Sequence, residues 1–138
     1  MIAASGNSNT NSCSFTPASA EDVYAVDSSD STDTRSSFSN FGACSNIVAP
    51  GSMITAAWIN SDTAISTISG TSMAAPHVAG VAAKLLSQAD YTPAALYREL
   101  TAKATVGMVS GFPNNPQPLL HMGCDEATRS NVHPMNLV

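Results

Sequence analysis

Residues 69–86, SGTSMAAPHVAGVAAKLL, constrain the fold of this chain more than any other stretch. Small residues lead into Ser72, and the residues that follow are apolar at almost every helical position. A helix that is apolar all round belongs inside a large fold rather than on a surface. Because proline is tolerated only within the first turn of a helix, Pro76 is expected there and places the helix start within a few residues of Ser72. The sequence therefore predicts a buried helix over residues 72–88.

Composition excludes several classes of function. The chain has 138 residues, enough for one modest domain with a core, and a formal net charge of −5. Its five cationic residues are spread along the chain, so no basic patch predicts nucleic-acid binding. No apolar run approaches the ~20 residues that a membrane span requires. Abundant Ser, Thr, Asn and Ala with few Lys and Glu residues are typical of a secreted hydrolase.

Short apolar runs bounded by turn residues set the expected fold class. Three of them predict buried strands, at residues 1–4, 23–26 and 47–49. Two further runs, 53–58 and 64–68, predict a β-hairpin that leads directly into the Ser72 turn. Short buried strands mixed with helices indicate an α/β fold with a mostly parallel sheet.

Capping signals and polarity predict the structure of the remaining segments. Thr92 followed by proline is a helix N-cap signal and predicts a second helix to about residue 104. The polar stretch 27–37 is predicted to be an ordered surface loop. Residues 119–120 predict a last short strand, and residues 123–138 are expected to form an irregular tail without packing.

A serine at the mouth of a helix has two interpretations. It is most often an N-cap, but free N–H groups and a partial positive charge at a helix N-terminus also stabilise an oxygen anion. Asn7, which follows Ser5 and Gly6, is either a turn residue or an uncharged N–H donor for such an anion. The residues alone leave both pairs of alternatives open.

Longer strings resemble one protein family. The string Gly-Thr-Ser-Met-Ala-x-Pro-His-Val-Ala-Gly around Ser72 resembles the nucleophile segment of the subtilisin-like serine proteases, or subtilases. Residues 36–42 and 49–51 match the same family in its order, and 119–120 resemble its closing segment. The likeness covers residues 1–122, is nearest to the proteinase K-like branch, and corresponds to the C-terminal half of a catalytic domain. It implies a three-layer α/β sandwich, present here as a partial domain.

The resemblance also implies an active site. Ser72 would be the nucleophile that forms an acyl-enzyme with polypeptide substrates. Asn7, in a string that resembles the family's Ala-Ser-Gly-Asn segment, would build the oxyanion hole together with the Ser72 backbone N–H. One wall of the pocket for the substrate side chain before the cleaved bond would be formed by Ala3, Ala4, Ser5 and Gly6.

A serine hydroxyl requires a base, normally a histidine oriented by an acid. The family's chain order is Asp, His, Ser, so both activating motifs are expected upstream of residue 1. His77 matches a structural residue of the nucleophile motif and is expected to point into the core, while His121 and His133 follow in the irregular C-terminal part. We therefore expect the fragment to be inactive unless the N-terminal half of the catalytic domain is supplied. The alternative is a non-catalytic truncated homologue or binding fragment.

The chain has an odd number of cysteines, Cys13, Cys44 and Cys124, so at least one is free or paired outside the chain. Some proteinase K-like members carry a disulfide at positions that resemble Cys13 and Cys44. The resemblance thus implies a Cys13–Cys44 disulfide, with two buried free thiols as the alternative.

No metal or other cofactor is predicted from the residues themselves. Calcium stabilises many members of the family, which makes it possible in the full-length fold. The matching position here is Asn46, and an uncharged amide weakens a calcium site. Asp27, Asp30 and Asp33 have ligand-like spacing, but a solvated acidic loop is the preferred interpretation of their segment.

Overall fold

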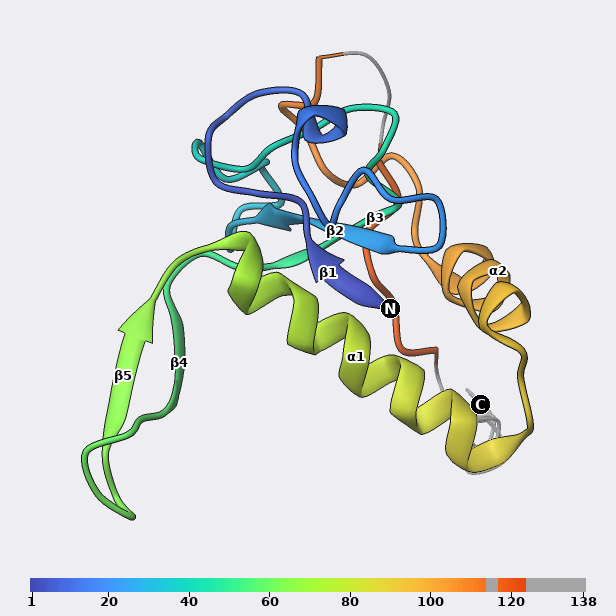
Figure 1. Ribbon diagram of the computed structural model, residues 1–138. Helices are drawn as coiled ribbons and strands as arrows, with labels where there is room; N and C mark the ends of the chain where they lie inside the picture. Colours follow the sequence, from blue (N-terminus) through green and yellow to red (C-terminus); the bar gives the residue numbers. More distant parts are fainter. Residues whose placement is uncertain (114–116, 124–138) are drawn as a thin grey trace, which may run out of the picture.

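Three short parallel strands form the centre of the fold in the computed structural model, which describes residues 1–113 and 117–123 (Figure 1). They are β1 (Ile2–Ala4), β2 (Tyr24–Ser29) and β3 (Ile47–Pro50), in the order β1–β2–β3. Ala4 of β1 pairs with Val26, which in turn pairs with Ile47 of β3. The middle strand β2 is buried along its whole length. The mostly parallel sheet predicted from the apolar runs is thus present.

Along the chain, an antiparallel hairpin lies between β3 and the long helix. Its strands are β4 (Ile54–Ala57) and β5 (Ile65–Ile68), and it projects away from the rest of the structure at the lower left of Figure 1. The apolar Ile59 and Ile65 on this hairpin are 89% and 72% exposed. The hairpin therefore contributes little to the core of the described part of the chain.

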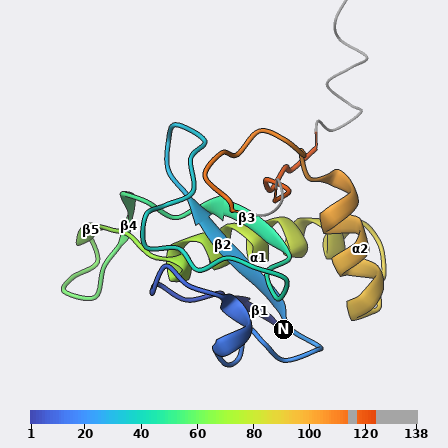
Figure 2. The same cartoon turned by 90° about the horizontal axis from the view of Figure 1, so that it is seen from above.

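Two helices pack against the sheet. Helix α1 (Thr71–Gln88) runs along the sheet, and α2 (Pro93–Lys103) lies beside its C-terminal half (Figures 1 and 2). Thr92 caps α2 because its hydroxyl accepts a hydrogen bond from Ala95 N at 3.3 Å. The buried core between helices and sheet comprises Tyr24, Val26, Ile47, Ala49, Ala74, Val78, Val81, Ala82, Leu85, Leu96 and Leu100.

Three expectations about α1 need correction. The helix is not buried all round: Ala79, Gly80 and Leu86 on its outer side are exposed, and Leu86 is 48% exposed. His77 is exposed too, rather than pointing into the core. Pro76 lies inside the helix instead of its first turn, so the Ser72 carbonyl lacks the usual N–H partner four residues on. The apolar pattern was right, but the described residues cover only one side of the helix.

The prediction of a surface loop over residues 27–37 was wrong at both ends. Asp27, Ser28 and Ser29 continue β2 and are fully or almost fully buried, and Ser36 is 2% exposed. Their polarity is compatible with burial because hydroxyl groups pair across the fold. Ser28 Oγ lies 2.7 Å from Ser36 Oγ, and Ser28 N donates to Ser39 Oγ at 2.9 Å.

The C-terminal segment contributes less than a strand. Leu119 forms one isolated β-bridge with Val48 of β3 and another with Thr105. The predicted strand at residues 119–120 is thus reduced to a single paired residue at the edge of the sheet. The irregular tail predicted for residues 123–138 lies outside the described residues except at Gly123. Among the helices of the described residues, none is long and apolar enough to cross a membrane.

Candidate active site

The end of β1 meets the N-terminus of α1. Asn7, three residues beyond β1, accepts two hydrogen bonds at its Oδ1, from Thr71 N at 2.9 Å and from Thr71 Oγ1 at 2.8 Å. The Thr71 hydroxyl in turn accepts a hydrogen bond from Gly6 N at 3.2 Å. These contacts join two segments 64 residues apart in sequence. The first turn of α1 and the Gly6–Asn7 turn are therefore fixed relative to each other.

This arrangement leaves the Asn7 amide nitrogen free. Only the carboxamide oxygen can accept from Thr71 N, so Nδ2 must point to the other side. Among the described residues, Asn7 Nδ2 has no hydrogen-bond partner, and the Asn7 side chain is exposed. A Cβ added at Gly70 would lie 3.3 Å from Asn7 Nδ2, so glycine permits this close approach. An uncharged donor is thus exposed beside the mouth of α1.

Ser72 is the second residue of α1, and its side chain is exposed. The N-cap residue of this helix is Gly70, which has no side chain, and the Thr71 N–H of the first turn donates to Asn7 Oδ1 instead. Ser72 is therefore not an N-cap, which was one of the two interpretations of a serine at this place. Its hydroxyl and the exposed Asn7 Nδ2 both sit at the N-terminal turn of α1, where backbone N–H groups favour developing negative charge.

A backbone corner holds the start of α1 against β3. Gly70 N donates to Gly51 O at 2.8 Å, and Gly51 N donates to Ser29 O at 3.0 Å. A Cβ on Gly51 would lie 2.3 Å from Ser28 Oγ and 2.7 Å from Gly70 O. Only glycine fits at residue 51 without displacing these atoms. This close contact is the physical reason for the glycine that ends the Ala49-Pro50-Gly51 string.

The predicted pocket residues lie on β1 and its exit. Ala3 and Ala4 are half-buried and pair with Ala25 and Val26 of β2, and Ser5 is fully buried. Among the described strands β1 pairs only with β2, so its other edge is open. Ala3, Ala4, Ser5 and Gly6 thus run along β1 and its exit toward Asn7, beside this open edge.

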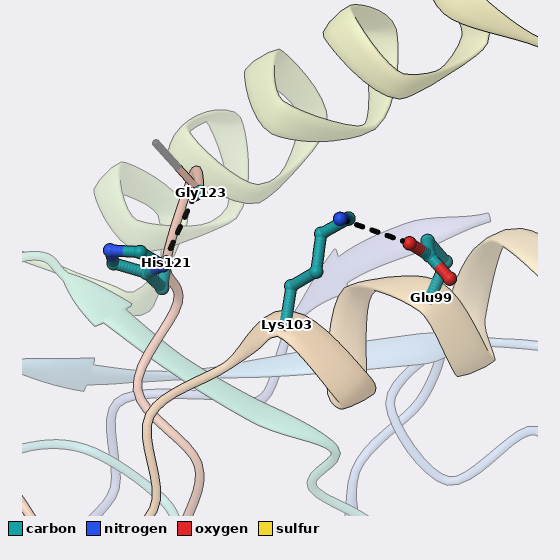
Figure 3. Close-up of polar contacts among 4 residues, drawn as sticks. All are labelled: Glu99, Lys103, His121 and Gly123. Carbon is teal, nitrogen blue, oxygen red and sulfur yellow. Dashed lines mark hydrogen bonds and ion pairs between the residues drawn. The ribbon is translucent and has the colours of Figure 1, made fainter. Parts of the chain in front are cut away.

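The histidines do not activate Ser72 in the described part of the chain. His77 Nδ1 lies 2.8 Å from Met73 O, and His121 Nδ1 accepts from Gly123 N at 3.1 Å. Figure 3 shows the His121–Gly123 contact and, apart from it, the ion pair of Lys103 with Glu99 on α2. Across residues 1–113 and 117–123, no hydrogen bond links Ser72 to a histidine or carboxylate. His133 lies outside the described residues.

A disulfide joins Cys13 and Cys44. Cys13 lies in the short 3-10 helix Ser12–Ser14, which Figure 1 shows on the side of the sheet away from α1. The neighbouring Ser45 Oγ donates to Ser12 Oγ at 3.0 Å and to Asp27 Oδ1 at 2.7 Å. The predicted bridge is thus present, and Cys124 lies outside the described residues.

The buried carboxyl of Asp27 was not foreseen from the sequence. Asp27 is fully buried, and its Oδ2 has no hydrogen-bond partner among the described residues. Burial raises its pKa from 3.8 to about 7, although the nearby Ser5 and Ser45 hydroxyls and the charge of Arg35 lower it in part. Asp27 is therefore a buried acid that titrates near neutrality, rather than a member of a solvated acidic loop.

Neither Asn46 nor the Asp30 turn fits a calcium ion, because their oxygens already accept hydrogen bonds. Asn46 Oδ1 accepts a hydrogen bond from Ala25 N at 2.7 Å, so the amide oxygen is already used by the strand. Asp30 Oδ1 accepts from Thr32 and from Thr34 N within its own turn, which lowers the pKa of Asp30. In the described ranges no three His, Cys, Asp or Glu side chains gather into a metal site.

Thr71 was missed by the sequence reasoning, although it stands next to Ser72 in the quoted string. Its two hydrogen bonds to Asn7 Oδ1 determine which end of the Asn7 carboxamide faces outward. The signal available in sequence was only a hydroxyl residue beside the serine. That signal does not identify the partner of the hydroxyl.

Comparisons with known proteins agree on one family. The family model described as Subtilase family matches residues 1–124. A subtilisin-like serine protease of Davidiella tassiana is 45% identical over 127 residues, which are 85% of this chain and 24% of that protein. A subtilisin-like serine protease of Cochliobolus lunatus is also 45% identical and is covered to 25%.

Solved structures show the same likeness in three dimensions. A cold-adapted subtilisin-like serine proteinase superimposes with a TM-score of 0.83 at 45% identity, over 88% of this chain and 44% of that one. A protease from Pseudoalteromonas arctica gives a TM-score of 0.76 at 28% identity, over 86% of this chain and 39% of that one. The predicted α/β fold of a partial domain is confirmed, and the chain spans about a quarter of the length of the curated relatives named above.

Proposed function

Because this chain belongs to the subtilase family, we propose that it carries the nucleophile and oxyanion hole of a subtilisin-like serine endopeptidase. The observation that supports this most directly is the contact between Asn7 Oδ1 and Thr71. It aims the free Asn7 Nδ2 outward beside Ser72, at the N-terminus of a helix. This is the arrangement that acyl transfer through a serine requires.

The proposed reaction follows from the positions of these groups. Ser72 Oγ attacks the carbonyl carbon of a peptide bond, and a base takes the hydroxyl proton. The carbonyl oxygen becomes an anion that accepts hydrogen bonds from Asn7 Nδ2 and from Ser72 N. As this intermediate collapses, the protonated base gives its proton to the amide nitrogen and the C–N bond breaks. The amine leaves and an ester remains on Ser72, which water then hydrolyses. A donor of this kind typically contributes ~10²–10³ in kcat.

The base and its orienting acid are proposed to come from an N-terminal half of the catalytic domain. Two features of the described residues support such a partner segment. The outer side of α1 exposes apolar residues, including Leu86, although a helix of this composition favours burial on every side. The open edge of β1 also offers backbone groups to a further strand. Without these segments we expect the chain to have little hydrolytic activity.

The setting we propose is secretion, with polypeptides as substrates. The Cys13–Cys44 disulfide supports this, because disulfides persist in oxidising compartments outside the cytosol. The scarcity of charged residues, 11% of the chain, agrees with the same setting.

The test is covalent labelling with a fluorophosphonate probe, which reacts with an activated serine. The 138-residue chain is assayed alone and after refolding with the upstream part of the catalytic domain of the Davidiella tassiana relative. We expect stoichiometric labelling of Ser72 only in the complemented sample, and none in Ser72→Ala. The exposed Ser61→Ala serves as the matched control and should label like the unmodified chain.

Two results would contradict the proposal. Robust labelling of Ser72 in the isolated chain would show that no upstream segment is needed. A folded complemented sample that never labels would favour the alternative, a non-catalytic truncated homologue.

A further inference from the structure

A buried asparagine lies behind the turn that carries Asn7. Asn40 is fully buried, and its carboxamide forms its hydrogen bonds with backbone groups of the segment around Asn7. Asn40 Nδ2 donates to Ser5 O at 2.9 Å. Asn40 Oδ1 accepts from Ser8 N at 3.0 Å and from Thr10 N at 3.2 Å.

These three hydrogen bonds flank Asn7 on both sides along the chain. One lies two residues before Asn7, one directly after it and one three residues after it. Asn40 is itself attached to the same turn, because Asn40 N donates to Gly6 O at 2.9 Å. A single buried side chain therefore holds the backbone at three points between Ser5 and Thr10, alongside backbone hydrogen bonds such as Asn9 N to Phe38 O at 2.9 Å.

The packing of Gly6 makes this contact close. Gly6 has a φ of +112°, and a Cβ added there would lie 2.3 Å from Asn40 Nδ2. The backbone before Asn7 thus lies directly on the Asn40 carboxamide. A residue with a larger side chain at Gly6, or a differently shaped side chain at residue 40, would displace the turn.

We propose that Asn40 is a positioning residue for the oxyanion hole, which holds the Ser5–Thr10 turn so that Asn7 reaches Thr71. The inference rests on the proposed role of Asn7, and it assigns Asn40 no contact with the substrate. Asn40 acts through Asn7: it holds the backbone of Asn7, Thr71 orients the Asn7 carboxamide, and Nδ2 is left to bind the anion. A displacement of about 1 Å in such a group can cost ~10²-fold in rate.

The structure supplies a reporter of this geometry that needs no activity. Thr71 is the first residue of α1, so its N–H has no partner within the helix and donates to Asn7 Oδ1 instead. Hydrogen exchange of the Thr71 amide, measured by NMR on the 138-residue chain, therefore reports the Asn7 contact. The Leu100 amide in α2 reports global stability.

The first variant is Asn40→Asp, which keeps the shape and the acceptor oxygen but replaces the donor to Ser5 O. A buried carboxyl also lowers global stability, which accelerates Leu100 exchange. We expect Thr71 exchange to accelerate ~10-fold or more beyond the change in Leu100 exchange, as loss of a buried hydrogen bond predicts. Asn60→Asp, the same change on an exposed hairpin residue, should leave both rates unchanged. A folded Asn40→Asp chain with normal Thr71 exchange would overturn the proposal.

The unmodified chain gives a second measurement if Asn40→Asp does not fold. The side-chain amide protons of Asn40 should exchange at least ~10-fold more slowly than those of Asn7, because the former are buried and bonded while Asn7 Nδ2 is exposed. Equal rates for the two carboxamides would contradict the positions assigned to them.

Labelling kinetics in the complemented sample separate positioning from general stability. Asn40→Asp should slow fluorophosphonate labelling of Ser72 by about 10- to 100-fold. In an Asn7→Ala background, which already lacks the donor, the same change should have less than about a twofold effect. Fully additive effects would contradict action through Asn7. If the unmodified complemented sample never labels, the proposed function fails, while the exchange experiment still decides the role of Asn40.

Discussion

Replacement of Asp27 by asparagine should change how the stability of the chain depends on pH. The carboxyl is fully buried beside β3, its Oδ2 has no hydrogen-bond partner among the described residues, and burial raises its pKa to about 7. The folded state therefore binds this proton more tightly than the unfolded chain, where the pKa is near the ordinary 3.8. Between these two values, folding takes up a proton.

The sign of the effect follows from that proton. The contribution of neutral Asp27 to the unfolding free energy is fully present below about pH 4 and falls as the pH rises toward 7. Above about pH 7 the unfolding free energy no longer changes through this group. The gap between a folded pKa of about 7 and the ordinary 3.8 corresponds to about 4 kcal/mol of unfolding free energy. The amide introduced by Asp27→Asn has no charge to bury, so the variant should lack this dependence.

The assay is urea unfolding followed by circular dichroism, at several values between about pH 4 and pH 8. The difference in unfolding free energy between Asp27→Asn and the unmodified chain should shift by about 4 kcal/mol in favour of the variant over this range. Asp62→Asn, on the exposed hairpin loop, is the matched control and should show no comparable shift. A difference that stays constant within about 1 kcal/mol would refute the argument that Asp27 is desolvated.

Two further perturbations test the packing around the site. Gly51→Ala should lower the unfolding free energy by more than about 2 kcal/mol in thermal denaturation, because the new Cβ would overlap a hydroxyl and a carbonyl oxygen. Gly80→Ala, with nothing within 4 Å of the added Cβ, should instead stabilise α1 by about 0.5–1 kcal/mol. Equal effects of the two changes would exclude the close corner at residue 51. Replacing Cys13 and Cys44 together by alanine should cost about 3–4 kcal/mol in urea unfolding, since the disulfide no longer limits the unfolded chain; an unchanged midpoint would show that the bridge does not contribute to stability.

The sequence predicted best those elements whose cause is local. The apolar run after Ser72 predicted α1 to within one residue, and the Thr92 cap with its following proline predicted α2 similarly well. Periodicity and capping act over a few residues, so a reader of the sequence can evaluate them directly.

What could not be predicted depends on partners far along the chain. Asp27 and Ser28 look like loop residues because their hydroxyl partners follow 8 to 18 residues later, and the buried strand is visible only once those partners are in place. The same holds for Asn7, whose contact with Thr71 spans 64 residues. The resemblance to the subtilases suggested that Asn7 and Ser72 act together, but not which atoms hold Asn7 in place.

Asn40 illustrates the limit most clearly. In sequence it lies within the string 36–42 that resembles the subtilases, but that likeness assigns no role to the Asn40 side chain. Only the folded backbone shows that its three partners enclose Asn7.

The corner between β3 and α1 has a consequence for the variation of this fold. The backbone leaves the corner after Gly51 and returns at Gly70, and Gly70 N donates to Gly51 O across the gap, while Met53 N donates to Ser69 Oγ just beyond it. The two ends of residues 52–69 are therefore joined independently of what lies between them. We therefore expect changes in the length of the hairpin beyond β4 and β5 to leave the start of α1 in place, so that a recognition loop grafted between these strands would not move Ser72.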